Sequence, residues 1–220
     1  MHTIANRYKR CFTEKGFIFS CIVTAIFLVI SLIVNYHAGI FATEEASNPV
    51  TDLILSNIPV FELDGTFVWG TILFWIFTIY IILHEPKRIP FTFNSISLFV
   101  LTRSLFISLT HIGPFPSHVA IDSGLISKFT FGGDLFFSGH VGLPFLLALI
   151  FWDIKRLRFS FLLWSFGFAC VVLMAHLHYS IDVISAYFIT YTIYHMASKL
   201  FRRDRGYFEL LSEERDPVML

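Results

Sequence analysis

The sequence has few charged residues, few cysteines, and no internal repeat or low-complexity tract. Charged side chains make up only 15% of the 220 residues, and the mean hydropathy of +0.70 is well above that of a soluble globular domain. The formal net charge is zero and no concentrated basic face is visible, which argues against a nucleic-acid partner. The three cysteines are an odd number, and we expect them to form no disulfide and no metal site. A membrane protein is therefore the first class to test.

Long apolar stretches dominate what the sequence does contain. A membrane-spanning helix needs about 20 mostly apolar residues, because the hydrocarbon core is about 30 Å thick and a helix rises about 1.5 Å per residue. The chain supplies six such stretches, and the last two are separated only by the short segment HLHY. They are residues 16–35, the uncharged interval between Asp64 and Glu85, and residues 90–110, 135–152, 159–175 and 181–198. The sequence predicts an all-α fold, a polytopic integral membrane bundle of six transmembrane helices.

The lysine and arginine residues predict the orientation of this bundle, because positively charged loops stay in the cytoplasm. All of them except Arg103 and Lys128 fall before the first span, between spans two and three, between spans four and five, or after the sixth. Both termini are then cytoplasmic. We divide the chain into a cytoplasmic N-terminal segment (1–15), a six-span catalytic membrane domain (16–201) and a cytoplasmic charged tail (202–220).

Ionisable residues converge on the non-cytoplasmic side under this topology. A titratable side chain inside or at the edge of a membrane is costly, so each one is a functional candidate. The residues near the outer ends of spans three to six are Arg103, His140, His176, His178 and Asp182.

The tripeptide Ser138-Gly139-His140 has the pattern of a helix start. Serine is a preferred N-cap and glycine permits close approach of the backbone, while the free amide groups and the helix dipole attract an anion. A phosphate could bind there beside His140. The same tripeptide also occurs at helix starts that bind no ligand, and the two interpretations stay open on this motif alone.

A second motif runs from His178 to Asp182. A spacing of four residues on a helical turn puts the imidazole and the carboxylate on one face, so Asp182 can accept a hydrogen bond from one ring nitrogen. The other nitrogen then stays free as a nucleophile. A simple hydrogen-bonded pair at a helix start is the alternative. A second histidine, His140, at the same membrane depth on a neighbouring helix favours the catalytic interpretation.

Two segments resemble the catalytic motifs of the sphingomyelin synthase family. They are GGDLFFSGHV at residues 132–141 and HLHYSIDVISAYFIT at residues 176–190. That family is similar in turn to the type 2 phosphatidic acid phosphatases. The segment RSLFISLTHIGP at residues 103–114 is similar to the motif in the family's third span, and a weaker similarity covers residues 48–59.

The resemblance implies a two-step mechanism without a cofactor. His178 would attack phosphorus, Asp182 would orient the imidazole and stabilise its charge, and His140 would protonate the leaving oxygen. Water or a second alcohol would then resolve the phosphohistidine. Arg103, as a buried cation, would pair with the phosphate or with an acid such as Asp134. The residues expected to bind the substrate or its phosphate are Ser138, Gly139, Arg103, Asp134 and Tyr179.

The remaining histidines have simpler interpretations. We expect His195 to be a packing or interfacial residue of the sixth span and His111 and His118 to be solvated in an outer loop. His176 precedes the expected nucleophile by two residues and can point away from the site, although the synthases carry a histidine there too.

Departures from both families leave the reaction open. The synthases carry a cysteine before their Gly-Asp pair, where this chain has Gly132, and their outer loop is longer. The phosphatases' first motif, a lysine followed by Arg-Pro, has no counterpart before His140. The primary hypothesis is a phosphotransferase that moves a phosphoalcohol headgroup from a phospholipid to ceramide or diacylglycerol. The alternatives are a lipid phosphate phosphatase with the same three residues and a non-enzymatic transporter or lipid-binding protein. The expected partners are membrane lipids, the site faces the non-cytoplasmic side, and a homo-oligomer stays open.

Overall fold

The computed structural model describes residues 4–117 and 133–213, and every regular element within these ranges is helical. His118, Lys128 and the ends of the chain therefore lie outside the described residues. The elements are α1 (Ile4–Cys11), α2 (Lys15–Glu44), α3 (Asp64–Leu83), η1 (Pro86–Arg88), α4 (Ile89–Leu109), α5 (Gly139–Ile150), α6 (Lys155–Met174), α7 (Ser180–Leu200) and α8 (Arg202–Glu213). The all-α class expected from the sequence is confirmed for this part of the chain.

Four of the described helices are long and apolar enough to cross a membrane, which makes the chain an integral membrane protein. They are α2, α3, η1 together with α4, and α6. These helices agree with four of the six expected spans. The other two differ: α5 has only 12 residues, about 18 Å of helix, and α7 has 21 residues but includes Asp182, His195 and Lys199 and is not apolar enough.

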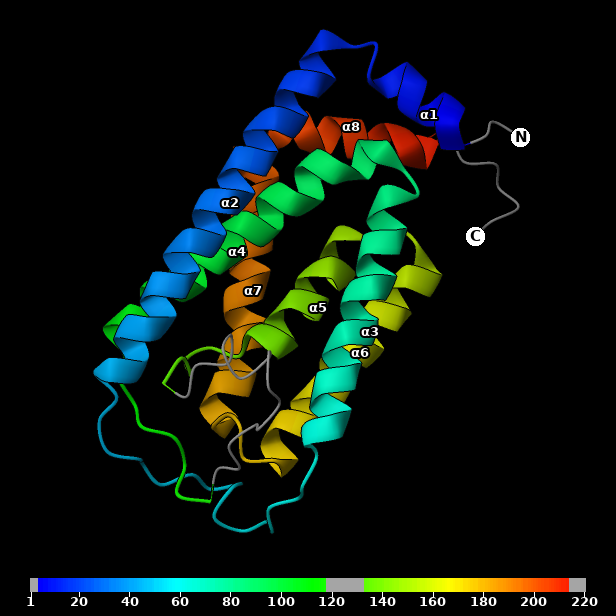
Figure 1. Cartoon of the computed structure of the whole chain (residues 1–220). Coiled ribbons are helices and arrows are strands. Elements are labelled where there is room, and N and C mark those ends of the chain that lie inside the picture. The colour runs from blue at the N-terminus through cyan, green and yellow to red at the C-terminus, as the bar shows by residue number, and fades with distance from the viewer. Residues whose placement is uncertain (1–3, 118–132, 214–220) are drawn as a thin grey trace.

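Helix α5 is short because the segment before it is not helical. The sequence predicted a span from residue 135, but the helix begins at Gly139. An additional helical turn would bond the Ser138 N–H to the Asp134 carbonyl, but this N–H donates to the Asp182 carbonyl instead. Arg103 on α4 binds the carbonyl groups of Asp134 and Phe137 and holds the segment in this non-helical form. Eight of the twelve α5 residues are buried, and Figure 1 shows that α5 begins short of the ends of α3 and α6. A helix enclosed by protein does not have to match the bilayer thickness.

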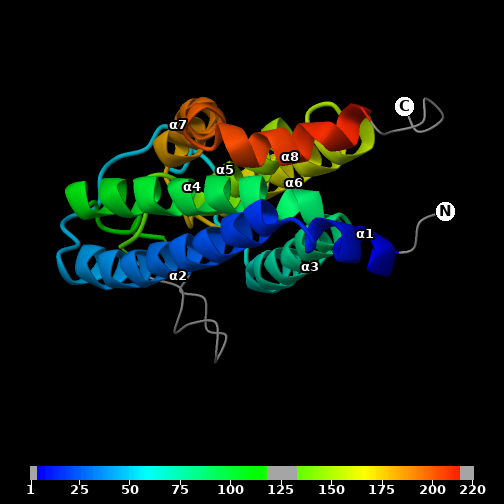
Figure 2. The ribbon, with the colours of Figure 1, turned by 90° about the horizontal axis from the view of Figure 1, so that it is seen from above.

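The packing around α5 is close. It contacts α4, α6 and α7, and Figure 2 shows α4 between α2 and α7. At Gly142 a Cβ atom would come within 2.7 Å of the Phe99 ring and 2.8 Å of Thr190 Oγ1. Glycine at this position lets α4 and α7 approach α5, so the three helices that carry the candidate site residues form one packed unit.

Helix α2 extends further than the hydropathy predicted. It continues past Asn35 to Glu44, which makes it about 45 Å long. The additional turns carry the small residues Ala38 and Ala42, which are buried with Ile107 of α4. This contact with α4 stabilises the additional turns of α2, because tertiary packing supplies most of the stability of a helix in a folded protein. The first connection is therefore shorter than expected and begins after Glu44.

The two terminal helices lie across the end of the bundle where both termini are found (Figure 1). Helix α8 contacts α4, α7 and η1. Its Asp204 is buried and accepts hydrogen bonds from Ser20 Oγ and, at 2.8 Å, from Asn94 Nδ2. Arg7 of α1 forms an ion pair of 2.6 Å with Glu85. The first part of the charged tail and the N-terminal helix are thus bound to the bundle.

Candidate active site

The candidate residues gather at the opposite end of the bundle from the termini. Helix α5 begins there, helix α7 begins there, and the last turns of α4 lie beside them (Figure 1). Two connections cover this end: residues 46–63 between α2 and α3, which is the first outer loop of the topology predicted from the sequence, and residues 110–117, the described part of the second outer loop of that topology. The sequence placed these residues at one membrane depth, and the structure brings them to one end of one bundle.

His178 and Asp182 form a buried pair. The distance from His178 Nδ1 to Asp182 Oδ2 is 3.4 Å, and Asp182 is completely buried. His178 precedes α7, which begins at Ser180, so the two side chains do not meet through a helical turn as the spacing suggested. They meet because Asp182 folds back over the start of the helix, where Oδ2 also accepts the Tyr179 N–H at 2.9 Å. Asp182 thus caps its own helix and contacts the imidazole with the same oxygen.

The start of α5 is joined to the start of α7. The Ser138 N–H donates to the Asp182 carbonyl at 3.2 Å, which links the two motifs through their backbones. Ser138 occupies the N-cap position, but its side chain makes no capping hydrogen bond. Its Oγ is fully buried and has no hydrogen-bond partner. Buried hydroxyl groups are normally paired, so this oxygen is a ready donor or acceptor for a ligand group at the α5 N-terminus.

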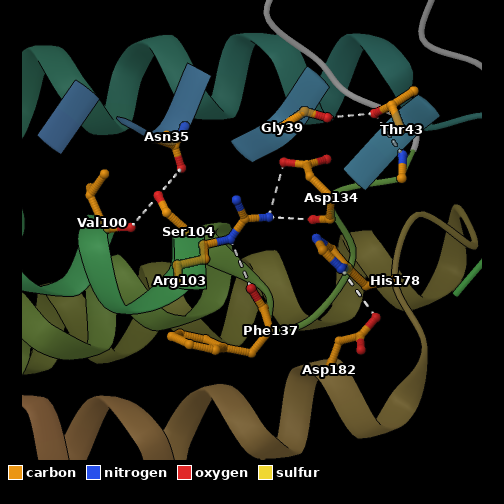
Figure 3. Close-up of polar contacts among 11 residues, drawn as sticks. Asn35, Gly39, Thr43, Val100, Arg103, Ser104, Asp134, Phe137, His178 and Asp182 are labelled. Atoms are coloured by element: carbon orange, nitrogen blue, oxygen red, sulfur yellow. Dashed lines mark hydrogen bonds and ion pairs between the residues drawn. The ribbon is translucent and has the colours of Figure 1, made fainter. Parts of the chain in front are cut away.

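Arg103 connects α4 to the segment before α5. Its Nε donates to the Phe137 carbonyl at 2.9 Å, and its Nη2 donates to the Asp134 carbonyl and, at 3.1 Å, to Asp134 Oδ2. Figure 3 shows this cluster and the His178 ring between the carboxylates of Asp134 and Asp182. Asp134 is the acid that the sequence offered as a partner for Arg103.

Two glycines allow this cluster to form. A Cβ on Gly139 would lie 3.3 Å from Arg103 Nε, so a side chain there would press on the guanidinium. A Cβ on Gly133 would lie 2.4 Å from the Ala42 carbonyl oxygen of α2, a backbone atom that cannot rotate away. The Gly133 N–H also donates to Thr43 Oγ1 at 3.3 Å. The extension of α2 therefore holds the segment that carries Asp134 (Figure 3).

His140 lies in an aromatic environment at the first turn of α5. The centroid of its ring is 4.4 Å from that of Phe67 on α3 and 5.7 Å from that of Phe168 on α6. The residue before His140, Gly139, lies against Arg103, and Ser138 bonds to the backbone of Asp182, the partner of His178. The start of α5, with His140, is thus joined both to Arg103 of α4 and to the His178–Asp182 pair.

Tyr179 and His176 face the outer loops. The Tyr179 hydroxyl donates to the Gly113 carbonyl at 2.8 Å and accepts the Val50 N–H at 3.2 Å. His176 has a φ of 55° and a ring nitrogen 2.5 Å from Ser117 Oγ. Burial lowers its pKa, although the Ile58 backbone and Asp52 oppose the change. Both side chains attach the α6–α7 turn to the loops that cover it.

Asp52 is a buried residue beside the site that sequence reasoning missed. It lies in the first outer loop, within the weak similarity at residues 48–59, and its Oδ2 accepts both the N–H and the Oγ–H of Ser180 at 2.8 Å. Burial raises the pKa of Asp52, but these bonds and those from Leu55 and Ile54 outweigh it, so the pKa is lowered overall. The sequence signals were one acid in a loop and this weak similarity, and neither singled out Asp52.

No group of three or more histidine, cysteine, aspartate or glutamate side chains suited to a metal ion occurs within the described ranges. The described side chains at this end of the bundle supply imidazole, carboxylate and guanidinium groups, and the N-terminus of α5 supplies free amide groups.

Residues 132–199 match the family model described as the PAP2 superfamily C-terminal domain. The match supports the type 2 phosphatidic acid phosphatase superfamily. It spans α5, α6 and most of α7, and so includes His140, His178 and Asp182. Members of the PAP2 superfamily are phosphatases and phosphotransferases that act on phosphoesters, and the chain is an enzyme of this general kind. No curated protein and no solved structure matches the chain.

Proposed function

We propose that the protein is a membrane lipid phosphotransferase similar to the sphingomyelin synthases. It would move a phosphoalcohol headgroup from a phospholipid to a lipid alcohol such as ceramide or diacylglycerol. The observation that carries this proposal is the joining of the two motifs: Ser138 bonds to Asp182, and Asp182 contacts His178. A general acid and an oriented nucleophile at one end of the bundle are the groups that phosphoryl transfer through a covalent intermediate requires.

The proposed reaction has two steps. In the first, a ring nitrogen of His178 attacks phosphorus, the bond from phosphorus to the leaving lipid oxygen breaks, and His140 gives that oxygen a proton. In the second, the hydroxyl of the acceptor lipid attacks phosphorus, the phosphorus–nitrogen bond breaks, and His140 takes the hydroxyl proton. Asp182 stabilises the imidazolium character of His178 in both steps, as the carboxylate does in comparable triads.

The phosphate would bind at the N-terminus of α5. Ser138 Oγ is buried without a partner there, and the first amide groups of the helix favour an anion. Arg103 adds positive charge beside Gly139 while Asp134 and the Phe137 carbonyl hold it in place. These residues would orient the phosphate between His140 and His178.

The proposed topology keeps six spans with both termini in the cytoplasm and the site on the non-cytoplasmic side. Helix α5 would cross the membrane interior as a core helix shielded by its neighbours. Helix α7 would keep Asp182 and Thr190 buried in the bundle, while the exposed His195 and Lys199 would lie in its cytoplasmic half. Tags placed on the two termini and in the first outer loop, tested for protease access in sealed vesicles, check this orientation. When protease is added to the cytoplasmic side of the vesicles, we expect it to cleave the tags on both termini and to leave the tag in the loop intact.

Product analysis with labelled donor lipid tests the activity. The purified chain in vesicles receives phosphatidylcholine labelled in its headgroup, with ceramide, with diacylglycerol, or without an acceptor. Label in the acceptor lipid supports the transferase. Release of water-soluble phosphocholine or phosphate regardless of acceptor identifies a hydrolase with the same residues. His178→Ala should abolish both products, and full activity in this variant would contradict the phosphohistidine route.

A further inference from the structure

The carboxylate of Asp52 accepts hydrogen bonds from the loop in which it lies and also from the start of α7. It is 7% exposed, and both of its oxygens are engaged. Oδ1 accepts the N–H groups of Ile54 and Leu55 at 2.8 and 3.0 Å, while Oδ2 accepts the N–H and the hydroxyl of Ser180, each at 2.8 Å. Oδ1 therefore binds only the loop that carries Asp52, and Oδ2 binds only Ser180, the first residue of α7.

Ser180 lies between the two residues of the catalytic pair. It follows His178 by two positions and precedes Asp182 by two, at the point where α7 begins. The first amide groups of a helix have no partner inside the helix, and a negative charge placed on them is stabilising. Asp52 supplies that charge from the first outer loop and fixes the turn that sets the direction of both side chains.

The first outer loop is itself held so that it can present this carboxylate. Ser47 N–H bonds to the His111 carbonyl at 2.8 Å, and Phe61 N–H bonds to the Met174 carbonyl at 2.9 Å. Between these two anchors, Val50 N–H bonds to the Tyr179 hydroxyl. The loop is therefore attached at both ends and in the middle, and Asp52 lies within the attached segment.

We propose that Asp52 is a positioning residue for the phosphoryl-transfer site, acting on His178 and Asp182 through Ser180. The inference rests on the proposed function, because it assumes that the His178–Asp182 pair reacts with phosphorus. A carboxylate that only anchored the loop would affect folding. One that positions the pair affects the chemical step more than substrate binding, because small displacements of a reacting group reduce the rate steeply.

Asp52→Asn and Ser180→Pro remove the same contact from its two sides. The asparagine side chain keeps the shape of aspartate, but its amide group must face either the Ser180 donors or the loop amide donors. Proline is well tolerated at the first position of a helix, and it removes both the N–H and the hydroxyl of Ser180. We expect each variant to lower kcat by about tenfold or more while KM changes by less than about threefold. Glu45→Gln, which neutralises an exposed acid next to the same loop, is the matched control and should keep wild-type kinetics.

The double variant tests the route. If Asp52 acts through Ser180, combining Asp52→Asn with Ser180→Pro should cost no more than the larger single change, because both remove one interaction. If the double variant loses kcat by the product of the two single fold-changes, the two residues act independently and the route through Ser180 is overturned. Wild-type kcat in both single variants overturns the positioning role. So does a fall in kcat that is fully explained by the fraction of protein unfolded at the assay temperature, as read from a thermal melt. In those two cases the proposed function still stands if His178→Ala is inactive. If His178→Ala is active, the proposed function is wrong, whatever the Asp52 variants show.

Discussion

Arg103→Lys measures how much of the site depends on the geometry of the guanidinium and how much on its charge. Arg103 is buried and makes three hydrogen bonds to the segment before α5, two of them to backbone carbonyls. A lysine keeps the positive charge but has one nitrogen on a flexible chain, so it cannot reproduce the planar fork that bridges Phe137 and Asp134.

The size of the effect follows from these bonds. At least one buried carbonyl would lose its donor, at a cost of about 1–3 kcal/mol. For a chain of this length, each kcal/mol corresponds to a change in Tm of about 2–4 °C, so the variant should melt about 2–12 °C below wild type. The segment before α5 that Arg103 holds leads directly into Ser138 and His140. If its release moved His140 by about 1 Å, kcat/KM would also fall by up to about 100-fold.

Thermal unfolding in detergent and transfer of labelled headgroup in vesicles are the two measurements. Arg205→Lys is the matched control, since Arg205 pairs with Glu209 at the surface and should change neither quantity. Wild-type Tm and wild-type activity in Arg103→Lys would refute the reasoning, because they would show that the charge alone suffices and that the bonds to the carbonyls carry little energy.

Three further predictions follow from the same geometry. A nitrophenyl phosphodiester, whose leaving group needs no proton, should restore the first burst in His140→Ala but not in His178→Ala, and equal rescue of both would show that the roles are misassigned. The pKa of Asp52 is lowered in the folded protein, so its contribution to stability is full above its ordinary pKa of 3.8 and is lost as the pH falls through the folded pKa. The Tm difference between wild type and Asp52→Asn should therefore be constant at neutral pH and shrink below about pH 4, and a difference independent of pH would contradict it. Gly133→Ala should lower Tm and activity together, because its Cβ meets the α2 backbone, whereas Gly65→Ala, which has open space around it, should change neither; a neutral Gly133→Ala would count against the close contact with α2.

Hydropathy alone predicted the helices that are long and apolar enough to cross a membrane. For α2, α3, α4 and α6, an apolar run of the right length is enough, because the membrane imposes a helix on any segment that crosses it. The motifs were also local: His178 and Asp182 are four residues apart and lie in contact, although they meet through the cap at the start of α7 and not through a helical turn. These parts of the fold and of the candidate site follow from near neighbours in the chain.

The tertiary structure decided everything that depends on partners far away in the sequence. The bond from Asp52 to Ser180 joins residues 128 positions apart, and no periodicity marks it. The Ser138 N–H bonds to the Asp182 carbonyl, and Arg103 holds the segment before α5, so the short helix is a consequence of packing and not of composition. The extension of α2 to Glu44 depends on small residues that fit α4. The sequence alone therefore determined four helices long and apolar enough to cross a membrane and the local motifs that are candidates for chemistry. Only the folded chain decided how those motifs are held, because that depends on contacts between surfaces that no local pattern encodes.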